Sequence, residues 1–145
     1  MTKRSLVLLA AGLLVAASGG IHLRLYREGY REISVDRVLG LDISRSFALN
    51  AVAGLLIGIA LVAAALGLIR GTIPAVAGLV FSGGAIVAYT LSRTVGLLGF
   101  EESRWITEAY WAEVVQVAAV LLLGWWLVTE HVFYSEPREA VTAPS

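Results

Sequence analysis

Four long apolar runs constrain this 145-residue chain more than any other feature of its sequence. Each run has the roughly 20 residues that an α-helix needs to cross about 30 Å of hydrocarbon. Helices are expected because a chain in lipid must satisfy its backbone hydrogen bonds internally, and no ten-residue alternation indicates a β-barrel. The predicted fold class is therefore an all-α integral membrane four-helix bundle. Its spans are predicted at about 5–25, 46–69, 73–98 and 107–128.

The composition agrees with a membrane protein. Hydrophobic residues make up 58% of the chain and charged residues 15%, whereas soluble domains are about half apolar and a quarter charged. This apolar composition makes the lipid bilayer an expected partner. Eleven basic and 11 acidic residues cancel, so no nucleic acid is expected as a partner. The absence of cysteine excludes disulfides, thiolate metal sites and thiol redox chemistry. We predict one domain over 1–134 and a short disordered tail over 135–145.

Glycines and aromatic residues mark the predicted ends of the spans. Gly71 predicts a tight hairpin between the second and third spans, and Gly99 predicts the end of the third. The tandem sequence YREG-YREI after the first span predicts an interfacial connector there. Tyrosine, tryptophan and arginine side chains prefer the membrane interface. The predicted interfacial residues are Tyr26, Arg27, Tyr30, Arg31, Trp105 and Trp111.

The first span bears most directly on topology. Lys3 and Arg4 precede it, as in a cytoplasmic N-terminal anchor, and an even number of spans puts both termini on one side. We therefore predict a bacterial cytoplasmic membrane protein with cytoplasmic termini. Counting the arginines of the connecting loops favours the opposite orientation, which stays open. The small residues AAS at 16–18 also allow the alternative of a cleaved signal peptide.

Small residues recur at helical spacing and predict close helix packing. Gly12, Ala16 and Gly20 form one such line in the first span, and Gly54 and Gly58 form a G-x-x-x-G in the second. Helices in lipid associate through such small residues because their backbones can then approach closely. Packing within the bundle is the favoured interpretation, and a homodimer is the alternative.

Polar residues within the spans gather toward the side of the long connecting loops. His22 lies near the end of the first span and Asn50 one turn into the second. Since alternate spans run in opposite directions, polar residues late in the third span and early in the fourth reach a similar depth. An ionised side chain costs at least a few kcal/mol in a bilayer unless it is paired or hydrated, so we expect an ion pair between Arg93 and Glu113. The predicted cluster comprises His22, Asn50, Arg93, Glu113, Gln116 and Tyr89.

This cluster has a structural and a functional interpretation. In the first, the expected ion pair locks the third and fourth spans together. In the second, a small cavity open to the loop side lets Arg93 bind an anionic or carbonyl-bearing ligand while Glu113 and His22 exchange protons. A lone histidine outside any recognisable metal motif does not support a metal site or a cofactor, and none is predicted. No catalytic residue is assigned.

Several segments resemble known sequences. A histidine at the end of the first span is followed by GYREI, LNAVAGLLIGIAL, TVGLLGFEE and AEVVQVAAVLLL. Together they resemble small four-span membrane proteins of high-GC Gram-positive bacteria, over most of the chain. The resemblance implies the four-span architecture and transfers no reaction.

The first functional hypothesis is a non-enzymatic accessory or binding subunit, docked on lipid or on a larger membrane complex. The alternative is a small dimeric transporter or channel that binds an anionic or polar ligand at the cluster. No acidic, lysine or histidine residue falls at the midplane, where transport sites commonly lie, and this counts against the alternative. A membrane oxidoreductase or lipid-modifying enzyme is disfavoured because no cysteine pair or nucleophile motif is present.

Overall fold

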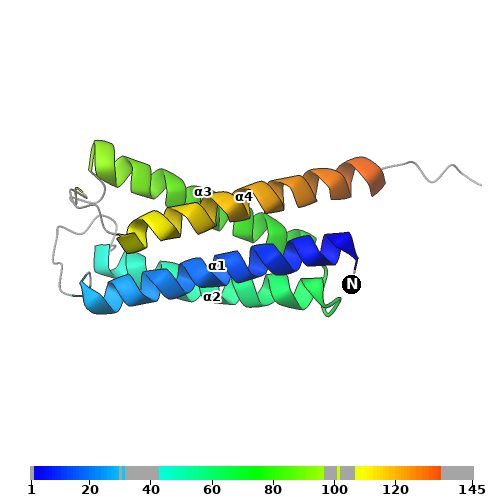
Figure 1. Ribbon diagram of the computed structural model, residues 1–145, viewed down its shortest axis with the longest axis horizontal. Coiled ribbons are helices and arrows are strands. Elements are labelled where there is room, and N and C mark those ends of the chain that lie inside the picture. The colour runs from blue at the N-terminus through cyan, green and yellow to red at the C-terminus, as the bar shows by residue number, and fades with distance from the viewer. Residues whose placement is uncertain (1, 30, 32–42, 97–100, 102–106, 135–145) are drawn as a thin grey trace, which may run out of the picture.

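The computed structural model describes residues 2–29, 31, 43–96, 101 and 107–134, and this part of the chain is all-helical (Figure 1). The helices are α1 (Lys3–Glu28), α2 (Ile43–Ala65), α3 (Thr72–Thr94) and α4 (Thr107–Tyr134). All four are long and apolar enough to cross a membrane, which indicates a multi-pass membrane protein. The predicted number and type of elements are confirmed. The predicted connector falls mostly, and the tail wholly, outside the described residues.

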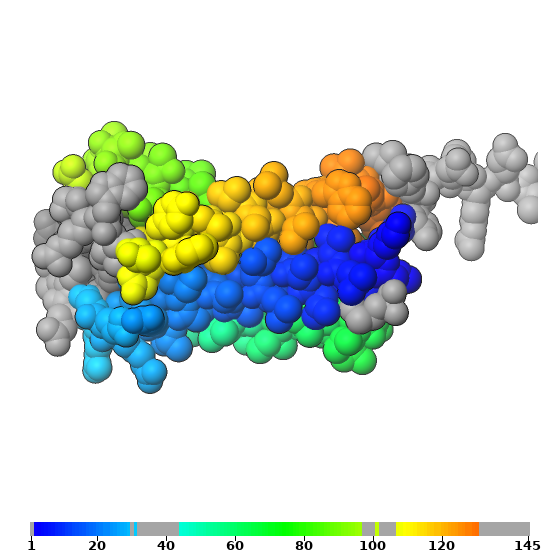
Figure 2. All heavy atoms as spheres, in the orientation of Figure 1, coloured from blue at the N-terminus to red at the C-terminus, as the bar shows by residue number. Residues whose placement is uncertain are grey.

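The four helices form an antiparallel bundle in which α1 packs against α2 and α4, and α3 packs against α4 and α2 (Figure 1). The start of α1, the α2–α3 hairpin and the end of α4 lie together at what we call the terminal end. The opposite ends of the helices form the loop end. Figure 2 shows α1 between α4 and α2 along this face of the molecule. The N-terminal helix therefore makes two of the interfaces that hold the bundle together.

The end of α2 is set by Gly67. This residue has φ of 77°, a value that favours glycine. Its N–H donates to the carbonyl of Ala64 in the last turn of α2. The next N–H, of Leu68, reaches back to the carbonyl of Ala63 at 3.0 Å, which completes a Schellman motif. Gly71 instead has φ of −77° and precedes α3. The hairpin is present as predicted, but its turn glycine is Gly67, and α2 ends four residues before the predicted Ile69.

The ends of α3 and α1 also differ from the prediction. Gly96, with φ of 79°, follows the end of α3 at Thr94, whereas the sequence favoured an end near Gly99. Gly99 lies outside the described residues. α1 begins two residues earlier than expected because Thr2 caps it, its Oγ1 accepting from the N–H of Ser5 at 3.1 Å.

The interface between α1 and α4 has heptad spacing. Apart from Gly12 and Gly19, which pack against α2, the buried residues of each helix recur at alternating intervals of three and four, which is the spacing of an antiparallel coiled coil. Five of the twelve residues are alanine or serine, so the two backbones can approach closely. The buried residues with this spacing are Leu8, Ala11, Val15, Ser18, His22 and Leu25 on α1, and Ala109, Ala112, Gln116, Ala119, Leu123 and Trp126 on α4.

Two polar contacts between α1 and α4 show that the two helices have the same register at both places. Arg4 Nη1 lies 3.1 Å from Glu130 Oε2 near the terminal end, and Gln116 Nε2 donates to Ser18 Oγ at 2.9 Å closer to the loop end. Two heptads separate the contacts on α1, and two heptads separate them on α4. The helices therefore keep one register along the bundle.

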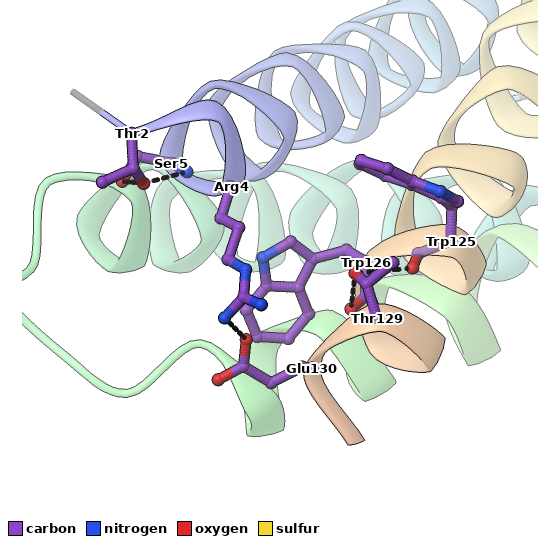
Figure 3. A network of polar contacts seen from close by, with 7 residues as sticks. All are labelled: Thr2, Arg4, Ser5, Trp125, Trp126, Thr129 and Glu130. Atoms are coloured by element: carbon purple, nitrogen blue, oxygen red, sulfur yellow. Dashed lines mark hydrogen bonds and ion pairs between the residues drawn. The ribbon is translucent and has the colours of Figure 1, made fainter. Parts of the chain in front are cut away.

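Ion pairs lie near both ends of this interface. At the terminal end the Arg4–Glu130 pair lies beside the capped start of α1 (Figure 3). Near the loop end Arg24 Nε lies 3.0 Å from Glu28 Oε1, and Arg24 Nη2 lies 3.7 Å from Glu108 Oε1. The side chains of Arg4 and Glu130 are 36% and 34% exposed, so their pair contributes under about 1 kcal/mol. The two pairs that join α1 to α4, Arg4–Glu130 and Arg24–Glu108, fix register more than they stabilise the fold.

The interface between α1 and α2 is built on glycine. A Cβ placed on Gly58 would lie 2.7 Å from Ala16 Cβ and 2.8 Å from the carbonyl oxygen of Gly12. A Cβ placed on Gly54 would lie 2.9 Å from the Cα of Gly19. Real Cβ atoms do not approach other atoms so closely, so the two backbones touch only because these side chains are absent. The predicted G-x-x-x-G of the second span is thus an internal packing motif.

The predicted line of small residues on the first span is wrong at its third position. A Cβ built on Gly20 meets no atom within 4 Å, whereas one built on Gly19 would lie 2.8 Å from the backbone N of Leu55. One residue turns a helix by about 100°, so a shift of one position moves a side chain off the interface. The interface therefore uses Gly12, Ala16 and Gly19.

The outer surface of the bundle is apolar on every helix. Large aliphatic side chains stand exposed along its length, as expected where lipid replaces water. Since inward and outward residues are equally apolar, the interior is marked by small residues and close packing. Exposed examples are Leu13, Leu49, Val52, Leu56, Ile59, Val80, Val87, Leu121 and Val128.

Candidate functional site

A buried hydrogen-bonded group lies between α1 and α4 in the loop-end half of the bundle. Ser18 and His22 are one turn apart on α1, and Gln116 faces them from α4 at the heptad position opposite Ser18. Gln116 is 1% exposed, and its Nε2 donates to Ser18 Oγ at 2.9 Å. We call Ser18, His22 and Gln116 the polar layer.

The backbone of α1 fixes the orientation of the His22 ring. Its Nδ1 lies 2.8 Å from the carbonyl oxygen of Ser18, and a carbonyl can only accept, so Nδ1 carries the hydrogen. In the neutral ring the other nitrogen, Nε2, is then an acceptor. Nε2 makes no hydrogen bond to any residue that the structure describes. The ring is 9% exposed, and its centroid lies 5.5 Å from that of Phe47 on α2.

The amide of Gln116 uses only one of its two ends. Within the described part of the chain, Oε1 is buried and has no hydrogen-bond partner. Turning the amide over would let Ser18 donate to Oε1 and would leave the NH₂ group unpaired instead. In either orientation one end stays unsatisfied, and a buried group in that state costs about 1–3 kcal/mol. Together with His22 Nε2, the polar layer has hydrogen-bonding capacity that the described residues do not use.

Two of the six predicted cluster residues are brought together. His22 and Gln116 both bond to Ser18, through its carbonyl oxygen and its hydroxyl respectively. Tyr89 and Arg93 form a separate contact on α3, with Arg93 Cζ 5.8 Å from the centre of the Tyr89 ring, within cation–π range.

The other two predicted members, Asn50 and Glu113, are partly buried. Neither makes a hydrogen bond or ion pair with another described side chain, and no ion pair joins Glu113 to Arg93. Close apolar packing contributes to the contact between α3 and α4 instead. A Cβ built on Gly78 of α3 would lie 2.8 Å from Leu123 Cδ1 of α4.

The predicted interfacial residues lie near the loop end where they are described. Tyr26 and Arg27 are in the last turn of α1, and Arg31 beyond it is exposed. Trp111 is exposed near the start of α4, with its ring centroid 5.8 Å from that of Tyr110. Tyr30 and Trp105 lie outside the described residues. A role for this group as a membrane anchor stays a prediction.

Ser18 is the residue that sequence reasoning undervalued. It is not one of the six predicted cluster residues, yet both other members of the polar layer bond to it, His22 to its backbone carbonyl and Gln116 to its hydroxyl. The signal that finds it is its three-and-four spacing with Val15 and His22. That spacing is hard to see in the sequence because almost every residue around it is apolar.

Comparison with protein-family models, with curated proteins and with solved structures gave no match. Among the residues that the structure describes, no group of three histidine or acidic side chains is placed to hold a metal ion. The chemistry of the polar layer therefore carries the functional argument.

A further buried polar atom, Ser82 Oγ on α3, tests the cost of unused hydrogen-bonding groups. It has no hydrogen-bond partner among the described residues. Ser82→Ala is expected to raise the free energy of unfolding in bicelles by about 1 kcal/mol, since it removes an unpaired hydroxyl at little change in volume. Ser92→Ala is the control, because Ser92 Oγ donates to the carbonyl of Tyr89 at 2.8 Å. It should leave stability unchanged or lower it. A destabilised Ser82→Ala would mean that the Ser82 hydroxyl is bonded in the folded protein.

Proposed function

We propose that this chain is a multi-pass protein of the bacterial cytoplasmic membrane, with cytoplasmic termini, that acts as a non-enzymatic binding or accessory subunit. The observation that carries the proposal is the unused capacity of the polar layer. A buried amide with one end unpaired lies in the same layer as a histidine whose Nε2 has no described partner. Buried polar groups are nearly always paired, so an unpaired one in the interior needs a reason. Binding of a ligand supplies that reason.

The depth of the polar layer favours a ligand that enters from the loop end or from the surrounding lipid. Gln116 lies about 13 Å along α4 from its start, and His22 lies about 9 Å from the end of α1. The layer is therefore within the hydrocarbon and nearer to the loop end. If the termini are cytoplasmic, as Lys3 and Arg4 suggest, the ligand is held in the outer half of the bilayer.

The alternative of a small dimeric transporter or channel is disfavoured by the packing of the bundle interior. Val15, Leu61 and Leu123 are fully buried and belong to one apolar cluster that extends from the middle of the bundle to Leu8 and Trp126 at the terminal end. A polar ligand crossing within one copy would have to separate these side chains. Binding needs no such opening.

The proposal is tested by extracting the protein with its native lipids in polymer-bounded discs and analysing the discs by mass spectrometry. We expect a near-stoichiometric small molecule or protein partner with the wild type. Thr90→Val is the matched control, because the exposed Thr90 hydroxyl only donates to the carbonyl of Ile86 in its own helix. This variant should retain whatever the wild type retains.

Two outcomes would contradict the proposal. Discs that contain only bulk lipid would rule out a binding or accessory role. Accumulation of a solute in vesicles that depends on the protein would instead favour the transporter.

A further inference from the structure

We propose that the polar layer binds the hydroxyl group of a neutral, lipid-soluble alcohol or phenol. This inference rests on the proposed binding function and names the chemistry of the ligand. It follows from which atoms of Ser18, His22 and Gln116 are already used and which are not.

The donors and acceptors left free in the polar layer call for a group that can both donate and accept a hydrogen bond. His22 Nε2 is an acceptor, because Nδ1 donates to the Ser18 carbonyl at 2.8 Å. The unpaired end of the Gln116 amide is an acceptor in one orientation and a donor in the other. When Ser18 donates to Oε1, the free end of the amide is its NH₂ group, and a hydroxyl then donates its one hydrogen to His22 Nε2 and accepts from that NH₂ group.

Charged head groups fit the polar layer less well. A phosphate or carboxylate carries no hydrogen for His22 Nε2, and its charge would be desolvated at a depth where ions are costly. An ammonium could donate to both acceptors, but it too would lose its hydration at residues that are 1% and 9% exposed. Glu113, one turn from Gln116 toward the loop end, is the nearest acidic residue along α4. An amine is therefore included as a competing probe.

The fit to an amphiphile comes from the surroundings of the polar layer. The layer is enclosed between helices whose neighbouring interface residues are alanine, valine and leucine. The outer surface of the bundle is apolar along its length, so the ligand's tail can remain in lipid while its hydroxyl enters the layer. A water-soluble polyol would gain nothing from this setting, since its remaining hydroxyls would lose water without new partners.

The test uses three probes with one tail and different heads: farnesol, its methyl ether and farnesylamine. Binding to the full chain in phosphatidylcholine nanodiscs is measured by equilibrium partition, with empty discs subtracted. Farnesol should bind saturably, and the ether about tenfold more weakly, because the ether cannot donate to His22. This comparison needs no variant, so it cannot be lost to misfolding.

Two variants then assign the binding to the polar layer. His22→Asn keeps an N–H that can reach the Ser18 carbonyl but lacks an atom in the place of Nε2. Gln116→Leu keeps the side-chain volume and removes the amide. Each should weaken farnesol binding by about tenfold, and His22→Asn should leave ether binding unchanged, because the ether cannot donate to His22 in any case. Thr90→Val should change the binding of neither probe. Thermal unfolding of each variant checks that it is folded.

Several results would overturn the inference. Equal affinity for farnesol and its ether, stronger binding of farnesylamine, no saturable binding, or unchanged farnesol affinity in both folded variants each would do so. If a stoichiometric molecule is found in native-lipid discs but farnesol does not bind, the binding function stands and the hydroxyl assignment fails. If neither is seen, both fail.

Discussion

Gly19→Leu should destabilise the bundle by at least about 3 kcal/mol, whereas Gly20→Leu should leave its stability unchanged or slightly higher. The two glycines are neighbours in α1 and the substitutions are chemically identical. A Cβ on Gly19 would lie 2.8 Å from the backbone N of Leu55 and 3.0 Å from the carbonyl oxygen of Ala51. Both obstacles are backbone atoms of α2, so α1 and α2 would have to separate. At Gly20 no atom lies within 4 Å of a Cβ, and leucine favours the helix more than glycine does.

The measurement is reversible unfolding in bicelles, followed by circular dichroism or by steric trapping. Gly58→Leu provides a second variant on the opposite helix, because a Cβ there would lie 2.7 Å from Ala16 Cβ. It should lower stability as Gly19→Leu does. If Gly19→Leu and Gly20→Leu proved equally tolerated, α1 would not pack on α2 through the face described. If only Gly20→Leu were harmful, the sequence-based line through Gly20 would be the correct one.

The number and approximate extent of the helices could be predicted because each apolar run is long enough to cross a bilayer. Their ends were less predictable. The apolar run of α2 continues through Leu66, Leu68 and Ile69 after the helix has ended at Ala65. The hydropathy of the sequence does not reveal where α2 ends, because that end is set by the positive φ of Gly67. Two glycines, Gly67 and Gly71, lie in this connection, and the sequence does not show which of them has a positive φ.

The faces by which the helices meet were harder to predict than the helices themselves. In a soluble protein a polar stripe marks the outside, but here Leu121 outside and Leu123 inside are the same residue type. Small residues were the remaining guide, and they led to Gly20 instead of its neighbour. An error of one residue in that choice turns the face by about 100°.

For the candidate site, too, the depth of a residue along its helix could be predicted from the sequence, whereas the direction of its side chain around the helix could not. His22 and Gln116 were found from sequence because polar residues inside apolar spans are rare. Their depth followed from counting residues along the spans. The contact expected between Arg93 and Glu113 required knowledge of the direction in which each side chain points around its helix, and no ion pair joins them. Ser18 was undervalued because a serine is unremarkable in a helix until its partners are known.

Leu123→Ala should lower the free energy of unfolding by about 2 kcal/mol, whereas Leu121→Ala should change it by less than about 0.5 kcal/mol. Leu123 is 0% exposed and Leu121, half a turn away on α4, is 68% exposed. In a bilayer Leu121 contacts lipid and Leu123 contacts protein, and both surroundings are apolar. The free energy of transfer from water, which makes up much of the cost of such a substitution in a soluble protein, therefore largely cancels. What remains for Leu123 is the packing lost around a cavity, which puts the expected cost at the low end of the range for leucine to alanine.

The cavity prediction becomes sharper with a second substitution, Gly78→Ala. Alone it should destabilise the bundle, because its Cβ would lie 2.8 Å from Leu123 Cδ1 and 3.2 Å from Leu61 Cδ1. In the Leu123→Ala background the nearer obstacle is gone, and the new methyl group occupies part of the space that the leucine vacated. The double variant should therefore be more stable than Leu123→Ala alone, with a coupling of about 1 kcal/mol in a double-mutant cycle. Additive effects would mean that α3 and α4 do not meet at Gly78 and Leu123, which would remove the packing that closes the middle of the bundle and reopen the case for a transport path.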